Sequence, residues 1–160
     1  MEAMVNWQGN MAFDGKADTG FQVRLDADTS VGGQNNGLRP MELLAIGLAG
    51  CTAMDVISIL QKKRQDVTAF QVLAHMERRD SHPKVFTHAV LEYLVTGRAV
   101  DEAAVVRAIE LSASTYCSAQ AMFAQIMPVE LRYSIFEELG DGQPQLVKSG
   151  SYTLPEISAA

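Results

Sequence analysis

The chain contains two cysteines, Cys51 and Cys117, whose thiols are the groups best suited to covalent chemistry. Each has an ordinary alternative, because free cysteine is among the most buried residue types and packs like a small hydrophobe. As a pair they support a redox reaction, in which one thiolate attacks a peroxide, becomes a sulfenic acid and condenses with the second thiol to a disulfide. They are 66 positions apart in the sequence, and this separation leaves open whether the fold brings the two sulfur atoms together.

The local sequence distinguishes the two thiols. Cys51 lies in an apolar segment, where burial raises the pKa of a thiol and opposes its reaction unless a cation or oriented donors offset the effect. Asp55, one helical turn further on, is either a buried hydrogen-bond partner or a carboxylate that raises the pKa of the thiol. Cys117 is predicted to begin a short helix that ends near Gln125, where amide donors and the helix dipole favour the thiolate.

The elements that must position these residues predict an α+β fold. Alternating apolar runs predict strands over residues 5–8, 11–13, 21–25, 70–78, 86–95 and 129–136. Among the first three strands, Asp14-Gly15 and Thr19-Gly20 are expected to form turns. Asp101 predicts the N-cap of a helix between the last two strands.

A long apolar helix is the central element of this prediction. Pro40 and Glu42 favour a helix start, because a first-turn proline loses no intrahelical bond and a carboxylate suits the positive end of the dipole. The helix is apolar nearly all round, and its Gly47 and Gly50 indicate close packing. Residues 112–115 are poor helix formers and predict a break after the second helix.

Length and composition predict one domain. The chain has 160 residues, of which 48% are hydrophobic, enough for a substantial core over residues 1–138. Residues 139–160 are rich in Gly, Pro and Ser, so we expect a tail that is either mobile or docked as an appendage. Its apolar anchors are Leu146-Val147 and the segment 152–157.

Charge and hydropathy argue against several classes of protein. The net charge is −6 and no basic run is longer than Lys62-Lys63-Arg64, which disfavours nucleic acid as a partner. The longest charge-free apolar stretch, between Glu42 and Asp55, has 12 residues, fewer than the roughly 18 of a membrane-spanning helix. The N-terminus lacks the pattern of a secretory signal, so we expect a cytoplasmic protein.

The histidines do not complete a metal site by their spacing. His75, His82 and His88, together with two distant cysteines, lack the compact arrangement of zinc ligands. We therefore expect neither a metal site nor any other cofactor.

Three motifs carry a resemblance to a known family. They are Arg39-Pro40-Met41-Glu42-Leu43-Leu44-Ala45, the segment from Gly50-Cys51-Thr52-Ala53-Met54-Asp55 to Leu60, and Leu111-Ser112-Ala113-Ser114-Thr115-Tyr116-Cys117-Ser118. They resemble the OsmC/Ohr family (osmotically inducible / organic hydroperoxide resistance), most closely its YhfA-like branch, over about Trp7 to Phe136. The resemblance implies a single OsmC-like domain: antiparallel sheets packed around a long buried central helix and a second helix, in an intertwined homodimer.

The resemblance also implies a chemistry. It places Cys51 at the peroxidatic position and Cys117 at the resolving position of a thiol peroxidase that reduces small organic hydroperoxides in oxidative stress defence. By analogy with the family, a lipoyl-type dithiol would return the disulfide to the thiols. Three readings stay open: this peroxidase, a non-peroxidase OsmC-fold dimer that binds a small apolar ligand or senses redox state, and a structural pair of buried cysteines.

Two departures from the family pattern concern the groups around the thiolate. The hydroperoxidase branches carry a glutamate directly after the proline, where this chain has Met41, and the acid follows one residue later at Glu42. They also supply an arginine from the N-terminal strands, whereas residues 10–13 contain none. The candidate thiolate-stabilising arginines of this chain are Arg24, Arg39, Arg78 and Arg79.

Overall fold

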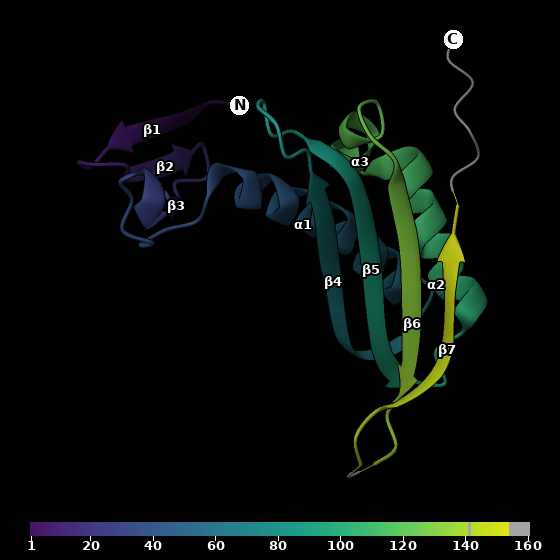
Figure 1. Cartoon of the computed structure of the whole chain (residues 1–160). Coiled ribbons are helices and arrows are strands. Elements are labelled where there is room, and N and C mark those ends of the chain that lie inside the picture. Colours follow the sequence, from purple (N-terminus) through teal and green to yellow (C-terminus); the bar gives the residue numbers. More distant parts are fainter. Residues whose placement is uncertain (141, 154–160) are drawn as a thin grey trace. The chain divides into compact units, whose positions relative to one another are not determined.

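The computed structural model describes residues 1–140 and 142–153 (Figure 1). Its elements are β1 (Ala3–Trp7), β2 (Phe13–Ala17), β3 (Gln22–Leu25), a 3₁₀ turn (Thr29–Val31), α1 (Pro40–Lys62), β4 (Asp66–Arg78), β5 (Phe86–Arg98), α2 (Glu102–Leu111), a π-helical turn (Ser112–Tyr116), α3 (Ser118–Phe123), β6 (Val129–Glu137) and β7 (Gln145–Tyr152). The chain divides into two units, residues 1–46 and the chain from Gly47 onward. The predicted order of strands and helices is confirmed, with β7 added at the end.

The first unit contains an antiparallel sheet in the order β1-β2-β3. The prediction of a turn at Asp14-Gly15 is wrong, because both residues lie within β2. Gly15 is closely packed there, since a Cβ would lie 3.2 Å from a methyl group of Val23 on the neighbouring strand. The first turn instead uses Gly9 and Asn10, whose φ angles of 97° and 47° lie in the left-handed region.

The second unit is built on a four-stranded sheet in the order β4-β5-β6-β7. The β5–β6 pair is parallel and the two outer pairs are antiparallel. Alternate residues of the two central strands are buried on one face, where Figure 1 shows α2 lying against the sheet. The buried stripes of α1 and α2 complete this core, and its members are Leu48, Val56, Leu60, Leu91, Tyr93, Val95, Ala104, Val105, Ala108, Ile109, Leu131, Tyr133 and Ile135.

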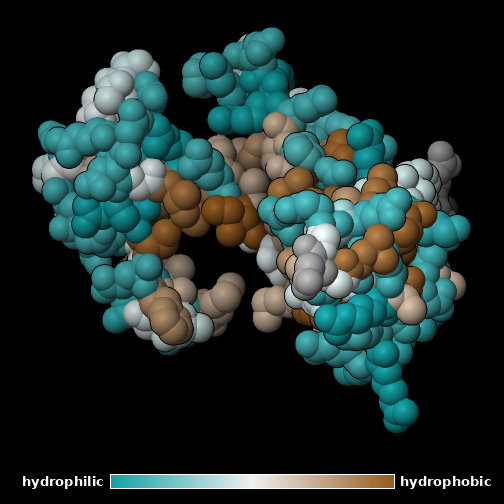
Figure 2. All heavy atoms as spheres, turned by 90° about the horizontal axis from the view of Figure 1, so that it is seen from below, coloured by the Kyte–Doolittle hydropathy of each residue, from teal (hydrophilic) through white to brown (hydrophobic). Residues whose placement is uncertain are grey.

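Helix α1 is covered on one side only in the single chain. Leu48, Thr52, Val56 and Leu60 recur every four residues and are fully buried, whereas Met54 is 74% exposed. Figure 2 shows hydrophobic side chains, in brown, at the surface of the molecule on the side seen in that view. By length and composition α1 could also cross a membrane, but core helices of soluble proteins meet the same test. Part of the apolar surface of α1 is therefore exposed to solvent in the single chain.

The described part of the C-terminal segment is docked in the sheet. Strand β7 pairs with β6 from Leu131 opposite Tyr152 to Glu137 opposite Gln145. The strand pairs closely at Gly150, where a Cβ would lie 2.5 Å from the hydroxyl of Tyr133. The predicted anchors beyond residue 153 lie outside the described residues.

Candidate two-cysteine site

The second unit brings Cys51 and Cys117 together from two different elements. Cys51 and Asp55 are four residues apart on α1, so they share one face of the helix. The predicted break after α2 is a π-helical turn, and Cys117 follows it with the extended backbone of the N-cap of α3. Its Sγ accepts a hydrogen bond of 3.3 Å from the backbone N–H of Gln120.

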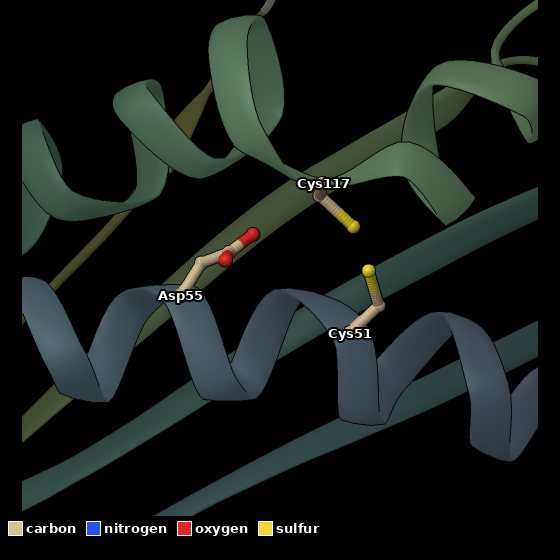
Figure 3. A group of neighbouring side chains, drawn as sticks. All are labelled: Cys51, Asp55 and Cys117. Atoms are coloured by element: carbon tan, nitrogen blue, oxygen red, sulfur yellow. The ribbon is translucent and has the colours of Figure 1, made fainter.

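The side chains of Cys51, Cys117 and Asp55 point toward one another (Figure 3). The two Sγ atoms and a carboxylate oxygen of Asp55 all lie within 4.8 Å of one another. Both cysteines are free thiols. Cys51 is partly exposed, whereas Cys117 is only 2% exposed, so a molecule arriving from solvent meets Cys51 first.

A buried chain of hydroxyl groups supports this cluster. Ser112 Oγ donates a 3.0 Å hydrogen bond to Asp55 Oδ2 and lies 2.9 Å from Thr52 Oγ1, which in turn lies 2.7 Å from the hydroxyl of Tyr93. Because the single hydroxyl proton of Ser112 is directed to Asp55, Thr52 donates to Ser112 and Tyr93 donates to Thr52. The chain joins β5, α1 and the π-helical turn, and so fixes the elements that carry both cysteines. Our sequence reasoning missed Thr52, whose only signal was a polar residue in the apolar stripe beside Cys51.

Burial dominates the electrostatics of Cys117. The pKa of its thiol is raised to about 12, chiefly by desolvation; the neighbouring Cys51 and Asp55 groups contribute to the rise, while the N–H of Gln120 opposes it. The prediction that the helix start favours a Cys117 thiolate is therefore wrong, because one amide donor does not offset the loss of water. Burial likewise raises the pKa of Tyr93, so both groups keep their protons at neutral pH.

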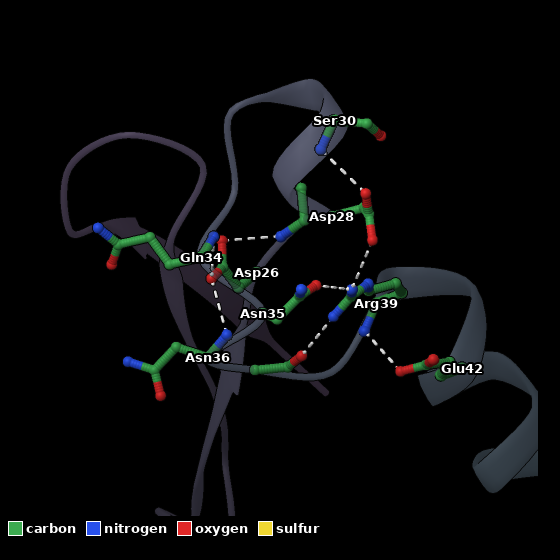
Figure 4. A network of polar contacts seen from close by, with 10 residues as sticks. Asp26, Asp28, Ser30, Gln34, Asn35, Asn36, Arg39 and Glu42 are labelled. Atoms are coloured by element: carbon green, nitrogen blue, oxygen red, sulfur yellow. Dashed lines mark hydrogen bonds and ion pairs between the residues drawn. The ribbon is translucent and has the colours of Figure 1, made fainter.

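Glu42 and Arg39 both lie in the first unit: Arg39 ends a loop held by its own polar contacts, and Glu42 lies in the first turn of α1 (Figure 4). Glu42 Oε2 accepts a 2.8 Å hydrogen bond from the backbone N–H of Arg39, the reciprocal half of a capping box at the start of α1. The Arg39 guanidinium binds the Asn35 side chain, the Gly37 carbonyl and, at 3.6 Å, Asp28. The carboxylate of Glu42 thus has a structural contact in this chain.

Asp26 organises the same loop. It is 3% exposed and accepts backbone hydrogen bonds from Ala27, Gln34 and Asn36, at 2.8 to 2.9 Å. These donors hold the pKa of the Asp26 carboxyl below its usual value. The loop that leads into α1 is therefore ordered by a carboxylate that binds backbone amides.

The other candidate arginines each bind an oxygen atom close to their own strand. Arg24 pairs with Asp14, Arg78 Nε donates to the Lys84 carbonyl at 3.0 Å, and Arg79 Nη2 donates to the Pro83 carbonyl at 2.8 Å. Arg78 and Arg79 share the second unit with the cysteines but make no hydrogen bond or ion pair with them in the part of the chain that is described.

The sequence also matches known proteins over the region that carries both thiols. The family model for OsmC-like protein matches residues 33–132, which include Cys51 and Cys117. The chain belongs to the OsmC-like family. It is similar to Protein YhfA of Escherichia coli K12, with 38% identity over 135 residues that cover 84% of this chain and 98% of YhfA. The predicted family is thereby confirmed.

Solved structures of similar proteins confirm the predicted α+β fold. A hypothetical protein from Aquifex aeolicus VF5 is 29% identical, with a TM-score of 0.75 over 86% of this chain and 97% of that one. An organic hydroperoxide resistance protein OsmC from Legionella pneumophila has a TM-score of 0.62 over 84% and 96% of the two chains. At 14% identity, the second likeness concerns the fold alone.

Proposed function

We propose that this OsmC-like protein is a thiol peroxidase that reduces small organic hydroperoxides in oxidative stress defence. The observation that carries the proposal is the pair of free thiols that face each other, of which only Cys51 is open to solvent. A partly exposed thiol can meet the substrate, and a buried thiol beside it can resolve the product. The hydroperoxide resistance proteins of the same fold are consistent with this chemistry.

The reaction divides into three balanced steps. The Cys51 thiolate attacks the terminal peroxide oxygen, the O–O bond breaks, and the alkoxide takes a proton to leave as an alcohol, with Cys51 oxidised to a sulfenic acid. The Cys117 thiol then forms the S–S bond, and its proton leaves with the sulfenic hydroxyl as water. A lipoyl-type dithiol finally exchanges with the disulfide and is itself oxidised. These steps need no metal or organic cofactor.

Groups that act on the Cys51 thiolate complete the proposal. Asp55 would accept the thiol proton after the two side chains approach each other, since its carboxylate oxygen is within 4.8 Å of Cys51 Sγ. A cation would then stabilise the thiolate, and the candidates remain Arg24, Arg39, Arg78 and Arg79. Glu42 stays a candidate for orienting that cation through the loop that holds Arg39.

The working form of the protein in this proposal is a cytoplasmic homodimer. Leu44, Ile46 and Met54 of α1 are 49%, 53% and 74% exposed, an apolar surface that a second copy would cover. Gly47 and Gly50 were predicted to allow close packing, yet a Cβ at either position would meet no atom within 4 Å. In our proposal that close contact comes from the second chain.

A specific observation also favours the second candidate function, a redox-sensing or apolar-ligand-binding dimer. Asp55 is the charged group beside both sulfur atoms, and a carboxylate disfavours a neighbouring thiolate. Slow formation of the disulfide, without efficient peroxide turnover, would then serve as a signal.

Consumption of an organic hydroperoxide in the presence of a dithiol tests the proposal. We expect Cys51→Ser to abolish turnover, and Cys117→Ser to stop after one turnover with a sulfenic acid on Cys51, detected by a dimedone adduct in mass spectrometry. Ser149→Ala on the exposed part of β7 serves as the control. Equal inertness of the wild type and Cys51→Ser refutes the peroxidase, and disulfide formation in that inert wild type supports the sensor.

A further inference from the structure

The cluster of Cys51, Asp55 and Cys117 offers three donor atoms of the kinds that bind transition metals. Two are thiol sulfur atoms and one is a carboxylate oxygen, and all lie within 4.8 Å of one another (Figure 3). Across residues 1–140 and 142–153, this is the one convergent group of three or more such side chains. Sequence spacing alone argued against a metal site, because the 66-residue separation hides a contact that the fold creates.

The distances suit a tetrahedral ion after a small adjustment. Zn–S bonds are about 2.3 Å and Zn–O bonds about 2.0 to 2.2 Å, so neighbouring ligand atoms of a tetrahedral zinc lie roughly 3.5 to 3.8 Å apart. Atoms that lie within 4.8 Å therefore need to approach by about 1.3 Å at most. Rotation of the partly exposed Cys51 and Asp55 side chains on α1 can supply this movement.

The surroundings hold the donors in place. Ser112 Oγ donates to Asp55 Oδ2, and the Gln120 N–H donates to Cys117 Sγ. Hydrogen bonds to metal ligands from the next layer of residues orient those ligands and strengthen binding. In the described part of the chain Asp55 forms no ion pair, so its negative charge has no fixed counter-cation.

The cluster also has an approach from solvent. A pocket of about 300 Å³ is lined by Asp55, Ser58, Ile59, Lys62, Leu111 and Tyr116. Asp55 belongs both to this pocket and to the donor cluster, so an ion that enters the pocket reaches a ligand directly.

We propose that Cys51 Sγ, Cys117 Sγ and the Asp55 carboxylate bind one thiophilic divalent cation of the zinc class, with water at the fourth position. On binding, the two S–H bonds break, two metal–sulfur bonds form and two protons pass to solvent, with no change of oxidation state. Metal binding and disulfide formation exclude each other, because both use the same sulfur atoms. This inference rests on the donor geometry and does not depend on the peroxidase activity.

Titration of the reduced full-length protein with Cd²⁺ tests the site, since cadmium–thiolate bonds give an ultraviolet charge-transfer band. We expect one ion per chain in the wild type and in the exposed-acid control Asp80→Asn, a band that is lost in Cys51→Ser and Cys117→Ser, and affinity at least about tenfold weaker in Asp55→Asn. Equilibrium dialysis with Zn²⁺ should give the same order, and the disulfide form should not bind.

Two outcomes overturn the proposal. Wild-type protein that shows no band and retains no zinc has no such site. Binding that survives in the Cys51→Ser/Cys117→Ser double variant places the ion elsewhere, and binding that is unchanged in Asp55→Asn contradicts the proposed set of three ligands. Circular dichroism of each variant confirms that it is folded, and peroxide turnover is measured separately, so failure of the metal site leaves the peroxidase result independent.

Discussion

Replacement of Thr52 by valine tests the hydroxyl chain that holds the two-cysteine site. Thr52 is fully buried, and its Oγ1 lies 2.7 Å from the Tyr93 hydroxyl and 2.9 Å from Ser112 Oγ. Valine keeps the branched shape but offers no donor or acceptor. The change leaves the buried Tyr93 hydroxyl without its partner, while Ser112 keeps its bond to Asp55.

The expected loss follows from these contacts. A typical buried hydrogen bond contributes about 1 kcal/mol, and an orphaned buried hydroxyl costs about 1 to 3 kcal/mol. The added methyl group returns about 0.8 kcal/mol of hydrophobic stabilisation. We therefore expect Thr52→Val to lower the free energy of unfolding by about 2 kcal/mol.

Urea unfolding under reducing conditions, at one fixed protein concentration, measures this loss. Thr68→Val is the matched control, because Thr68 is exposed and makes one long bond of 3.4 Å to Thr96. Tyr93→Phe removes the other end of the same contact, so its effect should overlap with that of Thr52→Val by about 1 kcal/mol in a double-mutant cycle. A loss below about 0.5 kcal/mol, or strictly additive effects, would refute the role assigned to the chain.

Three further changes probe burial, capping and association. Because the pKa of Cys117 is raised to about 12 in the folded state, the thiol loses its proton at lower pH in the unfolded chain than in the folded one. The contribution of this group to stability is therefore intact below about pH 8.5 and falls as the pH approaches 12. The difference in the free energy of unfolding between wild type and Cys117→Ala, measured against pH, should fall by about 1 kcal/mol per pH unit over this range, and a flat difference contradicts the prediction. Glu42→Ala should lower stability by about 1 kcal/mol in thermal or urea unfolding, whereas Glu42→Gln, which keeps an acceptor for the Arg39 N–H, should lose less. If Glu42→Gln abolishes turnover at unchanged stability, the acid acts in the chemistry. Met54→Glu places a charge on the exposed apolar side of α1 and should shift the sedimentation equilibrium from dimer to monomer. Lys84→Glu, at an exposed position, is the control. An unchanged association state would mean that a second copy does not cover this face of α1.

The predictable parts of the fold are those with strong local signals. Pro40 and the apolar run after it specify α1, and Asp101 caps α2 through a 3.0 Å bond to Ala103, as its position before the apolar repeat indicated. Strand β7 has the residues Gln145–Tyr152, which are mostly exposed and lack a clear alternation, so only its pairing with β6 defines it. Asp14-Gly15 carries a turn signal that is overridden by packing inside the sheet.

The candidate site likewise has parts that the local sequence predicts and parts that it does not. The types of Cys51 and Cys117 indicated redox chemistry, and the helix break before Cys117 could be read from residues 112–115. The approach of the two sulfur atoms, and the raised pKa of the Cys117 thiol, depend on how α1 packs with the connection between β5 and β6. Such contacts between distant parts of the chain cannot be predicted from the spacing of residues in the sequence.

The placement of the two cysteines on α1 and before α3 has a topological consequence. A bond between their sulfur atoms would close a covalent ring of chain that encloses β4, β5 and α2 and leaves β6 and β7 outside. A ring of this size restricts the unfolded chain enough to contribute about 4 kcal/mol in the loop-entropy treatment. Oxidation would thus link α1 to the crossover that precedes β6, so that the oxidised protein would resist unfolding more strongly than the reduced one.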